Sequence, residues 1–266
     1  MRNSKAELNN PVEGKRVRFV EDAGYPQNAD GVCGYLEAVG DSTSKRSFYD
    51  RVFKRLIDVI MSFCGLIILS PAFLIITVAV LIDDPGPIFF KQKRVGLNKR
   101  FFYLHKFRTM KMSTPHDTPT HMLVDPGRYI TRVGAFLRKH SLDELPQFWD
   151  IFVSNMSIIG PRPALYNQDL LTAERDRYNA NDIKPGLTGW AQINGRDELS
   201  IPDKARLDGV YTKKLNAGGF AAFLFDCRCF FGTAFSVARA EGVVEGGTGA
   251  AAGEEPHDPN NKENHK

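Results

Sequence analysis

The sequence predicts an α+β protein that is mostly helical, with a re-entrant helical hairpin in a membrane and a small β element. Three observations predict this fold class. A run of 24 residues from Val59 to Ile82 carries no charge, a Ser-Pro pair interrupts it at the middle, and basic residues flank both of its ends. An aromatic stretch after the run, bounded by turn residues, predicts a strand pair as the β element.

The two ends of the chain differ from its middle. Residues 1–48 mix Asn, Gly, Asp, Lys and Glu without sustained periodicity, so we predict a poorly ordered N-terminal extension. Residues 241–266 combine a Gly- and Ala-rich stretch with polar residues, which predicts a disordered tail. The first 40 residues contain no apolar core of a signal peptide, so none is expected.

The uncharged run predicts a membrane-inserted helix with a kink. Fifteen of its 24 residues are Ile, Leu, Val or Phe, and they fall on every side of a helix. Insertion of these side chains gains about 6 kcal/mol as an upper bound. Pro71 has no N–H, so the carbonyl of Ile67 loses its helical partner, and the Ser70 hydroxyl can satisfy a freed backbone group. The alternative interpretation is a buried core helix.

The charges around the run predict that both of its ends lie on the cytoplasmic side, where Lys and Arg accumulate. The basic residues are Arg46, Arg51, Lys54 and Arg55 before the run, and Lys91, Lys93 and Arg94 after it. A kinked helix with two cytoplasmic ends is a re-entrant hairpin, whose arms of about 12 residues reach about 18 Å, roughly the middle of the bilayer. A tilted span that tolerates its proline is the alternative.

Composition limits the function classes. Charged residues make up 25% and hydrophobic residues 42% of the 266 residues, which excludes a wholly disordered chain and a multi-span membrane protein. The net charge of +4 is too small to indicate a nucleic-acid binder. The four cysteines form neither a disulfide framework nor a CxxC zinc motif, which fits a reducing cytosol.

The stretch from Lys91 to Lys111 is basic and aromatic. It contains eight Lys or Arg and no Asp or Glu, with apolar and aromatic residues between them. This pattern is typical of a charged face beside anionic lipids, of a surface that stacks single-stranded nucleic acid, or of a phosphate-binding floor for a small anionic substrate. Composition does not decide among the three.

A pair of carboxylates marks the most informative local pattern. Ser141 and Glu144 have the spacing of a capping box, which predicts a helix over residues 143–153 with Pro146 in its first turn. Asp143 adds a second carboxylate at that helix start, where free N–H groups also attract phosphate. A carboxylate and a diphosphate would repel each other there unless a divalent cation such as Mg²⁺ lay between them. A purely structural cap is the alternative.

Four motifs in order resemble one family. They are KFRTM at Lys106–Met110, SLDELPQ at Ser141–Gln147, MSIIGPRP at Met156–Pro163 and KPGLTGWAQINGR at Lys184–Arg196. Together with the Ser-Pro pair in the apolar run, they resemble the bacterial sugar transferases, which are monotopic phosphoglycosyl transferases (polyprenyl-phosphate sugar-1-phosphate transferases). The resemblance covers about residues 48–240, and the order and spacing of the motifs make it specific.

This resemblance implies a reaction. Such enzymes transfer a sugar-1-phosphate from a UDP-sugar to polyprenyl phosphate, typically undecaprenyl phosphate, and release UMP in the first membrane step of polysaccharide or glycoconjugate synthesis. The family uses an Asp-Glu dyad and Mg²⁺, and Asp143 and Glu144 stand in that position. Asp143 would be the nucleophile that forms a phosphosugar–aspartyl intermediate, and a ligand of the metal. A carboxylate nucleophile divides one difficult displacement into two easier ones.

The resemblance also implies substrate-binding residues. These are Lys106, Arg108, Arg138 and Arg162, with Ser70 and Pro71 at the membrane kink. Tyr166, Gln168 and Trp190 could face nucleotide or sugar, although core packing is favoured for Trp190. The sequence assigns no role to Asp208.

The resemblance finally implies an arrangement in the cell. Residues 49–84 would form the re-entrant hairpin and residues 85–240 a catalytic domain with interfacial, amphipathic surface helices. One of these, Phe220–Val237, would lie flat on the membrane. The protein would be monotopic at the cytoplasmic face of the bacterial inner membrane, with membrane lipids and no nucleic acid as partners, and a homodimer is left open. A non-catalytic membrane-surface protein that binds anionic lipid or nucleic acid is the alternative function.

Overall fold

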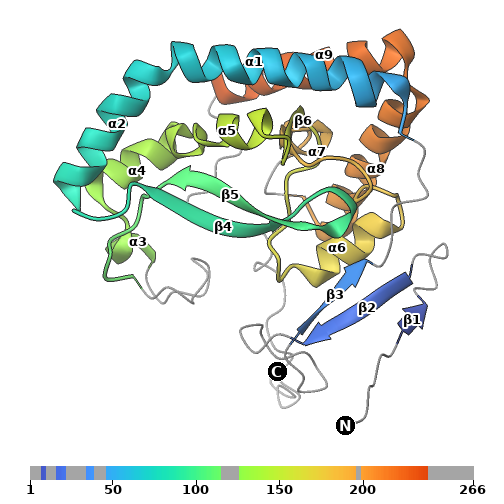
Figure 1. Ribbon diagram of the computed structural model, residues 1–266, viewed down its shortest axis with the longest axis horizontal. Coiled ribbons are helices and arrows are strands. Elements are labelled where there is room, and N and C mark those ends of the chain that lie inside the picture. The colour runs from blue at the N-terminus through green and yellow to red at the C-terminus, as the bar shows by residue number, and fades with distance from the viewer. Residues whose placement is uncertain are drawn as a thin grey trace, which may run out of the picture.

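The computed structural model describes residues 7–9, 16–21, 34–38, 46–114, 126–195 and 199–238, the first three segments as backbone alone. The predicted disordered tail, residues 241–266, lies outside them. Helices dominate and strands are short (Figure 1). In chain order the elements are β1 Glu7–Asn9, β2 Arg16–Glu21, β3 Gly34–Ala38, α1 Lys54–Ile68, α2 Ser70–Asp83, β4 Phe89–Val95, β5 Phe101–Phe107, α3 Pro126–Tyr129, α4 Arg132–Lys139, α5 Gln147–Phe152, β6 Ser157–Ile159, α6 Asp169–Asp176, β7 Gly186–Thr188, α7 Trp190–Ile193, α8 Ile201–Ala217 and α9 Gly219–Ala238.

The predicted kink separates α1 from α2. The two helices, with a π-helical turn at Tyr49–Phe53 before α1, are bent by 58° at Leu69. The Ser70 hydroxyl donates to the Ile67 carbonyl at 2.7 Å, which is the carbonyl that Pro71 leaves without a helical partner. Within the described residues no single helix has the length and hydropathy of a membrane span, whereas this bent pair has them jointly. Insertion in a membrane stays a prediction.

Helix α1 buries polar side chains and exposes apolar ones. Its buried side chains are polar and lie one helical turn apart, at Lys54, Asp58 and Ser62, while its outward face carries exposed apolar residues. Asp58 accepts hydrogen bonds from the Ser157 hydroxyl at 3.1 Å and the Ile158 amide at 2.9 Å. The alternative of a buried core helix is therefore wrong, because the apolar face is the one left uncovered.

The strand pair predicted after the hairpin is present. β4 and β5 form an antiparallel hairpin whose register runs from Phe89 opposite Phe107 to Val95 opposite Phe101. A short turn joins the strands, with the Gly96 amide donating to the Arg100 carbonyl at 2.7 Å. Figure 1 shows this hairpin below α5 and α1. The basic stretch is thus a rigid β element, and alternate side chains share one of its faces.

The main core joins the turn before α1 and the helices α8 and α9 to the rest of the domain. It contains Tyr49, Leu104, Ile151, Met156, Ile158, Ile159, Ile183, Tyr211 and Leu215, with Trp190 packed against it. Asp226 of α9 accepts hydrogen bonds there from Tyr49, Lys54 and Tyr211. The short parallel pair β6–β7 crosses this core, and a Cβ on Gly186 would lie 2.1 Å from the Gly160 amide nitrogen, so only glycine fits.

The N-terminal extension is not free of regular structure. β1, β2 and β3 form an antiparallel sheet with Val17 opposite both Leu8 and Ala38. The sequence predicted no regular element in these three segments, whereas the structure has a strand in each; the poor order expected of the extension stays a prediction. Only the first four residues of β2, Arg16–Phe19, alternate charged and apolar side chains, and a period of two over four residues is too short to stand out from a polar region.

Candidate active site

The two carboxylates of interest, Asp143 and Glu144 (the dyad), lie in a short 3₁₀ turn, Leu142–Glu144, between α4 and α5. The predicted capping box is wrong. Ser141 has φ 55° and ψ 21°, in the left-handed region, and its side chain caps no amide. The predicted helix over 143–153 is reduced to α5, Gln147–Phe152.

The turn has a local cause. Pro146 has no N–H to donate to the Leu142 carbonyl, which instead accepts from the Leu145 amide at 3.3 Å. The dyad is therefore displaced from the N-terminus of α5. The attraction for an anionic substrate comes from cationic side chains rather than from a helix dipole.

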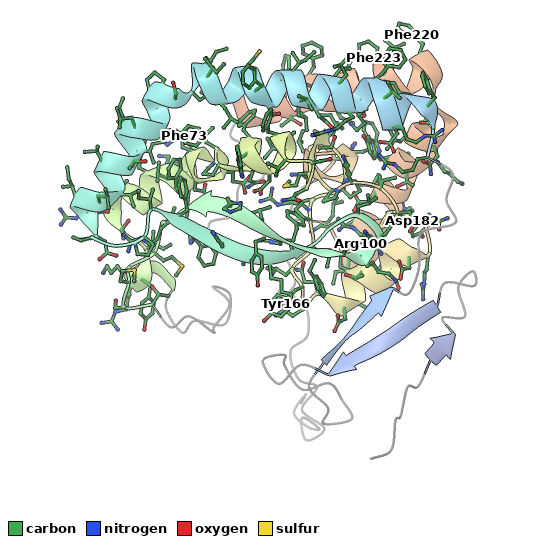
Figure 2. All side chains as sticks on the ribbon, in the orientation of Figure 1. Phe73, Arg100, Tyr166, Asp182, Phe220 and Phe223 are labelled. Carbon is green, nitrogen blue, oxygen red and sulfur yellow. The ribbon has the colours of Figure 1, made fainter. Side chains whose placement is uncertain are left out.

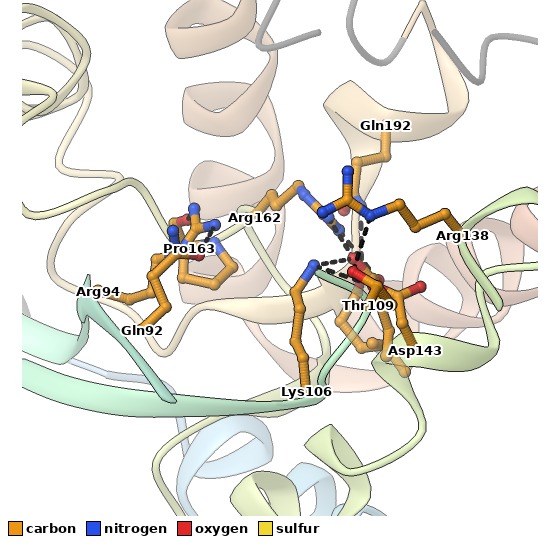
Figure 3. Close-up of polar contacts among 11 residues, drawn as sticks. Gln92, Arg94, Lys106, Thr109, Arg138, Asp143, Arg162, Pro163 and Gln192 are labelled. Carbon is orange, nitrogen blue, oxygen red and sulfur yellow. Dashed lines mark hydrogen bonds and ion pairs between the residues drawn. The ribbon is translucent and has the colours of Figure 1, made fainter. Parts of the chain in front are cut away.

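Glu144 is the firmly held member of the dyad. Its Oε1 accepts from Lys106 Nζ at 2.8 Å and from Arg162 Nη2 at 2.5 Å (Figure 3). Burial alone would raise the pKa of Glu144, but Arg162 and Lys106 hold that pKa well below its usual value. Glu144 is therefore ionised at neutral pH and fixes the positions of the Lys106 and Arg162 side chains.

Asp143 is held more loosely. Its residue is 8% exposed, and its Oδ2 lies 3.7 Å from Lys106 Nζ, beyond hydrogen-bonding distance. Burial raises the pKa of Asp143 against the opposing charge of Lys106, and Glu144 adds to the rise. An approaching cationic centre would favour the carboxylate form, in which a free oxygen can act as a nucleophile.

Two further predicted residues differ in position. Arg138, at the end of α4, donates from Nε to Thr109 Oγ1 at 2.8 Å, and its charge acts on Asp143 (Figure 3). Arg108 is not brought to the dyad. Its Nη1 donates to Asp84 Oδ2 at 2.8 Å and its Nη2 to the Asp84 carbonyl, so it fastens the end of α2 to β5.

Arg94 is a functional candidate that the motifs missed. Its Nη1 donates to the Pro163 carbonyl at 2.9 Å, and its Nε and Nη2 donate to Gln92 Oε1. Burial, together with the Arg162 charge, lowers the pKa of Arg94 to about 9. The signal was available, because a strand pair that places Lys106 opposite residue 90 also puts Gln92 and Arg94 on the face of Lys106.

The other aromatic and polar candidates pack locally. Trp190 packs against Phe225 with the rings tilted and 4.8 Å between their centroids, the core packing that was favoured, and the Gln168 amide oxygen accepts from the Leu165 amide. Asp208 forms a buried ion pair with Arg175 at 2.7 Å, a structural role that its sequence context does not reveal.

The dyad would hold a metal ion only if a substrate supplied further ligands. No group of three or more His, Cys, Asp or Glu side chains in the described part of the chain could hold a metal ion. The Glu144 carboxylate is paired with the cationic side chains of Lys106 and Arg162, and within the dyad only Asp143 has a carboxylate oxygen without such a partner. Mg²⁺ often binds through one or two carboxylates plus substrate phosphates and water, so these residues fit an ion that arrives with a diphosphate.

Comparison with known proteins gives consistent matches. A family model described as bacterial sugar transferase matches residues 49–240. A UDP-glucose:undecaprenyl-phosphate glucose-1-phosphate transferase of Xanthomonas campestris pv. campestris is 43% identical over 152 residues, which are 56% of this chain and 31% of that protein. The chain thus spans about a third of that relative's length.

Two relatives are similar over most of their length. An uncharacterized sugar transferase, EpsL of Bacillus subtilis, is 35% identical over 73% of this chain and 91% of its own length. The exopolysaccharide production protein PSS of Rhizobium leguminosarum bv. phaseoli is 33% identical over 70% of this chain and 96% of its own. With the family match spanning the hairpin, the dyad and all four motifs, the chain belongs to the bacterial sugar transferase family.

Proposed function

We propose that this protein transfers a sugar-1-phosphate from a UDP-sugar to polyprenyl phosphate and releases UMP. The observation that carries the proposal is the buried dyad, in which Lys106 and Arg162 fix Glu144 while Asp143 keeps a free oxygen. Relatives whose names specify undecaprenyl-phosphate sugar transfer support the substrate classes. The sugar itself is left open.

The first step is a displacement at phosphorus. An Asp143 carboxylate oxygen attacks the β-phosphorus of the UDP-sugar, the bond from that phosphorus to the bridging oxygen breaks, and UMP leaves with that oxygen. Arg162 and Lys106 offset the charge that develops on the phosphoryl oxygens. Mg²⁺, held by Asp143 and the diphosphate, would supply further charge neutralisation. Arg94 holds the Pro163 carbonyl and so supports the loop that carries Arg162.

The second step regenerates the carboxylate. A phosphate oxygen of polyprenyl phosphate attacks the phosphosugar–aspartyl phosphorus, the bond to Asp143 breaks, and polyprenyl diphosphate sugar forms. Arg138 is positioned to receive the acceptor phosphate, because it lies beside Asp143 and is held by Thr109. Excluding water from this step favours transfer over hydrolysis, and the burial of Asp143 serves that need.

The apolar faces support a location at the cytoplasmic face of the bacterial inner membrane. Exposed Leu56, Ile60 and Ile67 line the outward side of α1. Phe220, on the outer edge of the molecule in Figure 2, begins a row on α9 that continues at Leu224, Phe231 and Phe235. Exposed apolar surface of this extent is typical of a membrane-binding face. Asp226, on the opposite side of α9, is bonded inward.

The alternative of a non-catalytic surface that binds lipid or nucleic acid has less support. Such a surface would present its basic side chains to solvent, whereas Lys106 and Arg162 both pair with Glu144, and the partly buried Arg94 donates to the Pro163 carbonyl.

A purified-enzyme assay tests the proposal. UMP release is measured with undecaprenyl phosphate, Mg²⁺ and a panel of UDP-sugars, and mass spectrometry is used to detect the phosphosugar adduct without acceptor. We expect one or more sugars to give UMP and an adduct on Asp143. Asp143→Asn should lose at least about 10³-fold in rate, since it removes the nucleophile. Turnover by that variant at the unsubstituted rate would overturn the proposed mechanism.

A further inference from the structure

An apolar groove runs between α2 and α4, outside the dyad. It has a volume of about 340 Å³ and is lined by Ile75, Ile76 and Ala79 of α2 and by Val133, Phe136 and Leu137 of α4, with Arg132 beside them. The two helices lie against each other at the end of the molecule that α2 forms (Figure 1). A volume of this size lies in the range of small-molecule pockets, about 300–1,000 Å³.

The floor of the groove continues beneath the dyad. Ile76 and Leu137 belong to one apolar cluster with Phe107, and Leu142 and Leu145 pack against that cluster. Leu142 and Leu145 are the immediate neighbours of the dyad in the chain, and Phe107 follows its lysine partner. The groove and the reacting carboxylate therefore share one continuous apolar support.

One helix connects the groove to the cations. Val133, Phe136 and Leu137 of α4 line the groove, and Arg138, the residue after Leu137, acts on Asp143. Val133 and Arg138 are separated by about 7.5 Å along the helix axis. The Val133 amide donates to Asp83 Oδ2 at 2.8 Å, so α4 is fixed to the end of α2. A ligand that fits both regions has an anionic head directly joined to an apolar chain.

We propose that this groove holds the head-proximal isoprene units of the polyprenyl phosphate acceptor while its phosphate lies at Arg138 and the dyad. The inference rests on the proposed function, which supplies the acceptor. A phospholipid has similar apolar chains, but its phosphate is a diester that a glycerol unit separates from them, whereas polyprenyl phosphate joins a monoester phosphate directly to its first isoprene unit. The acceptor gains both regions in one molecule, and the groove therefore selects the lipid substrate.

Filling the groove gives the first test. Ala79→Trp places a large side chain in the groove, and Leu74→Trp is the matched control, because Leu74 is 67% exposed on the same helix and outside the groove. We expect Ala79→Trp to raise KM for polyprenyl phosphate about tenfold or more. The acceptor-independent burst of UMP serves as the internal reference. Leu74→Trp should change neither quantity by more than about twofold.

A graded variant separates blocked binding from misfolding. Ala79→Leu fills less of the groove, so its KM should lie between those of the unsubstituted enzyme and Ala79→Trp, with an unchanged elution volume in detergent. Equal acceptor KM values for all three enzymes would overturn the groove proposal while leaving the proposed function intact. A missing UMP burst in the unsubstituted enzyme would instead count against the proposed function.

Photolabelling gives a second test that needs no turnover. A polyprenyl phosphate with a diazirine on its first isoprene units is crosslinked to the full chain in nanodiscs, and the labelled peptides are mapped by mass spectrometry. We expect label on α4 or on the Ile75–Ala79 segment, removed by excess undecaprenyl phosphate but not by phosphatidylglycerol. Equal competition by phosphatidylglycerol would assign the groove to bulk lipid, and label confined to other segments would also overturn the proposal.

Discussion

Two adjacent carboxylates stand in opposite electrostatic environments. Lys106 and Arg162 hold the pKa of Glu144 well below its usual value, whereas burial raises that of Asp143. Neighbouring acids whose pKa values are pushed apart commonly divide their roles. This division fits the proposal that Glu144 orients Lys106 and Arg162 while Asp143 is the reacting carboxylate. This division makes the two residues separable by mutation.

Glu144→Gln should leave Asp143 in place but weaken the hydrogen bonds that hold Lys106 and Arg162. An amide oxygen accepts more weakly from Lys106 and Arg162 than a carboxylate does, a loss of about 1.5–3 kcal/mol. We expect UMP release to fall about 10–100-fold while the aspartyl adduct still forms. Stopped-flow measurement of the UMP burst gives the rate, with Glu174→Gln, on an exposed ion pair, as the control. An unchanged burst rate would contradict the orienting role.

At this scale the motifs predicted much of the site, and packing explains the exceptions. Lys106, Arg138 and Arg162 meet the dyad as expected. Arg108 lies just beyond the end of β5 and pairs instead with Asp84 at the end of α2, a contact that the motif alone does not predict. Arg94 lies outside the four motifs, and its place on the face of Lys106 follows from the strand register rather than from any motif. The left-handed Ser141 likewise carries no sequence signal beyond that of a helix cap.

Among the elements, α4 is positioned by one close approach. A Cβ on Gly134 would lie 2.1 Å from the carbonyl oxygen of Thr109, the residue whose hydroxyl accepts from Arg138. The Thr131 hydroxyl caps the helix by accepting from the Gly134 amide at 2.9 Å. The position of Arg138 thus depends on glycine, with no Cβ, at residue 134, one turn earlier in the helix.

Gly134→Ala should displace α4 even though alanine favours helices. The new methyl group must push α4 away from Thr109, at a cost of about 1–3 kcal/mol. A shift of about 1 Å at Arg138 can lower the rate about 10²-fold. Thermal unfolding and UMP release are measured beside Ala135→Ser on the exposed face of α4. Full activity of Gly134→Ala would show that α4 tolerates displacement.

The hairpin illustrates what an element reveals in sequence. Pro71 predicted both the break and the carbonyl that needs a new donor, and Ser70 supplies it. The burial of Lys54 and Asp58 was not predictable, because their partners Asp226 and Ser157 lie about a hundred residues or more away in the chain. The β1–β3 sheet was missed because its strands are short and set among polar residues.

Both ends of the hairpin should face the same compartment. Cysteines are introduced at exposed Arg51 and Lys91, one at each end, after the native cysteines are replaced. A membrane-impermeant maleimide should label both from the cytoplasmic side of inverted vesicles and neither from the outside of intact spheroplasts, since basic flanks favour that side. Label at one end alone would restore an ordinary span.

For the whole molecule, the reaction should require a divalent cation. The Asp143 carboxylate is not hydrogen-bonded to Lys106, so its negative charge repels a diphosphate beside it unless a cation neutralises the contact. EDTA should stop UMP release, and added Mg²⁺ should restore it. Ca²⁺ should restore less, because its larger and more flexible coordination fits this contact poorly. Full turnover in EDTA would remove the metal from the mechanism.

One contact between elements determines where in space the chemistry occurs. Arg55 of α1 donates to the carbonyls of Ile151 at 2.8 Å and Phe152 at 2.7 Å, the last two residues of α5. The other end of α5 begins three residues after Glu144. A helix of six residues is about 9 Å long. If α1 rests on the bilayer, the catalytic oxygen stands at a constant height above it. The catalytic oxygen then does not move toward the bilayer, so the phosphate of each acceptor lipid must reach that height by the thermal motion of the lipid.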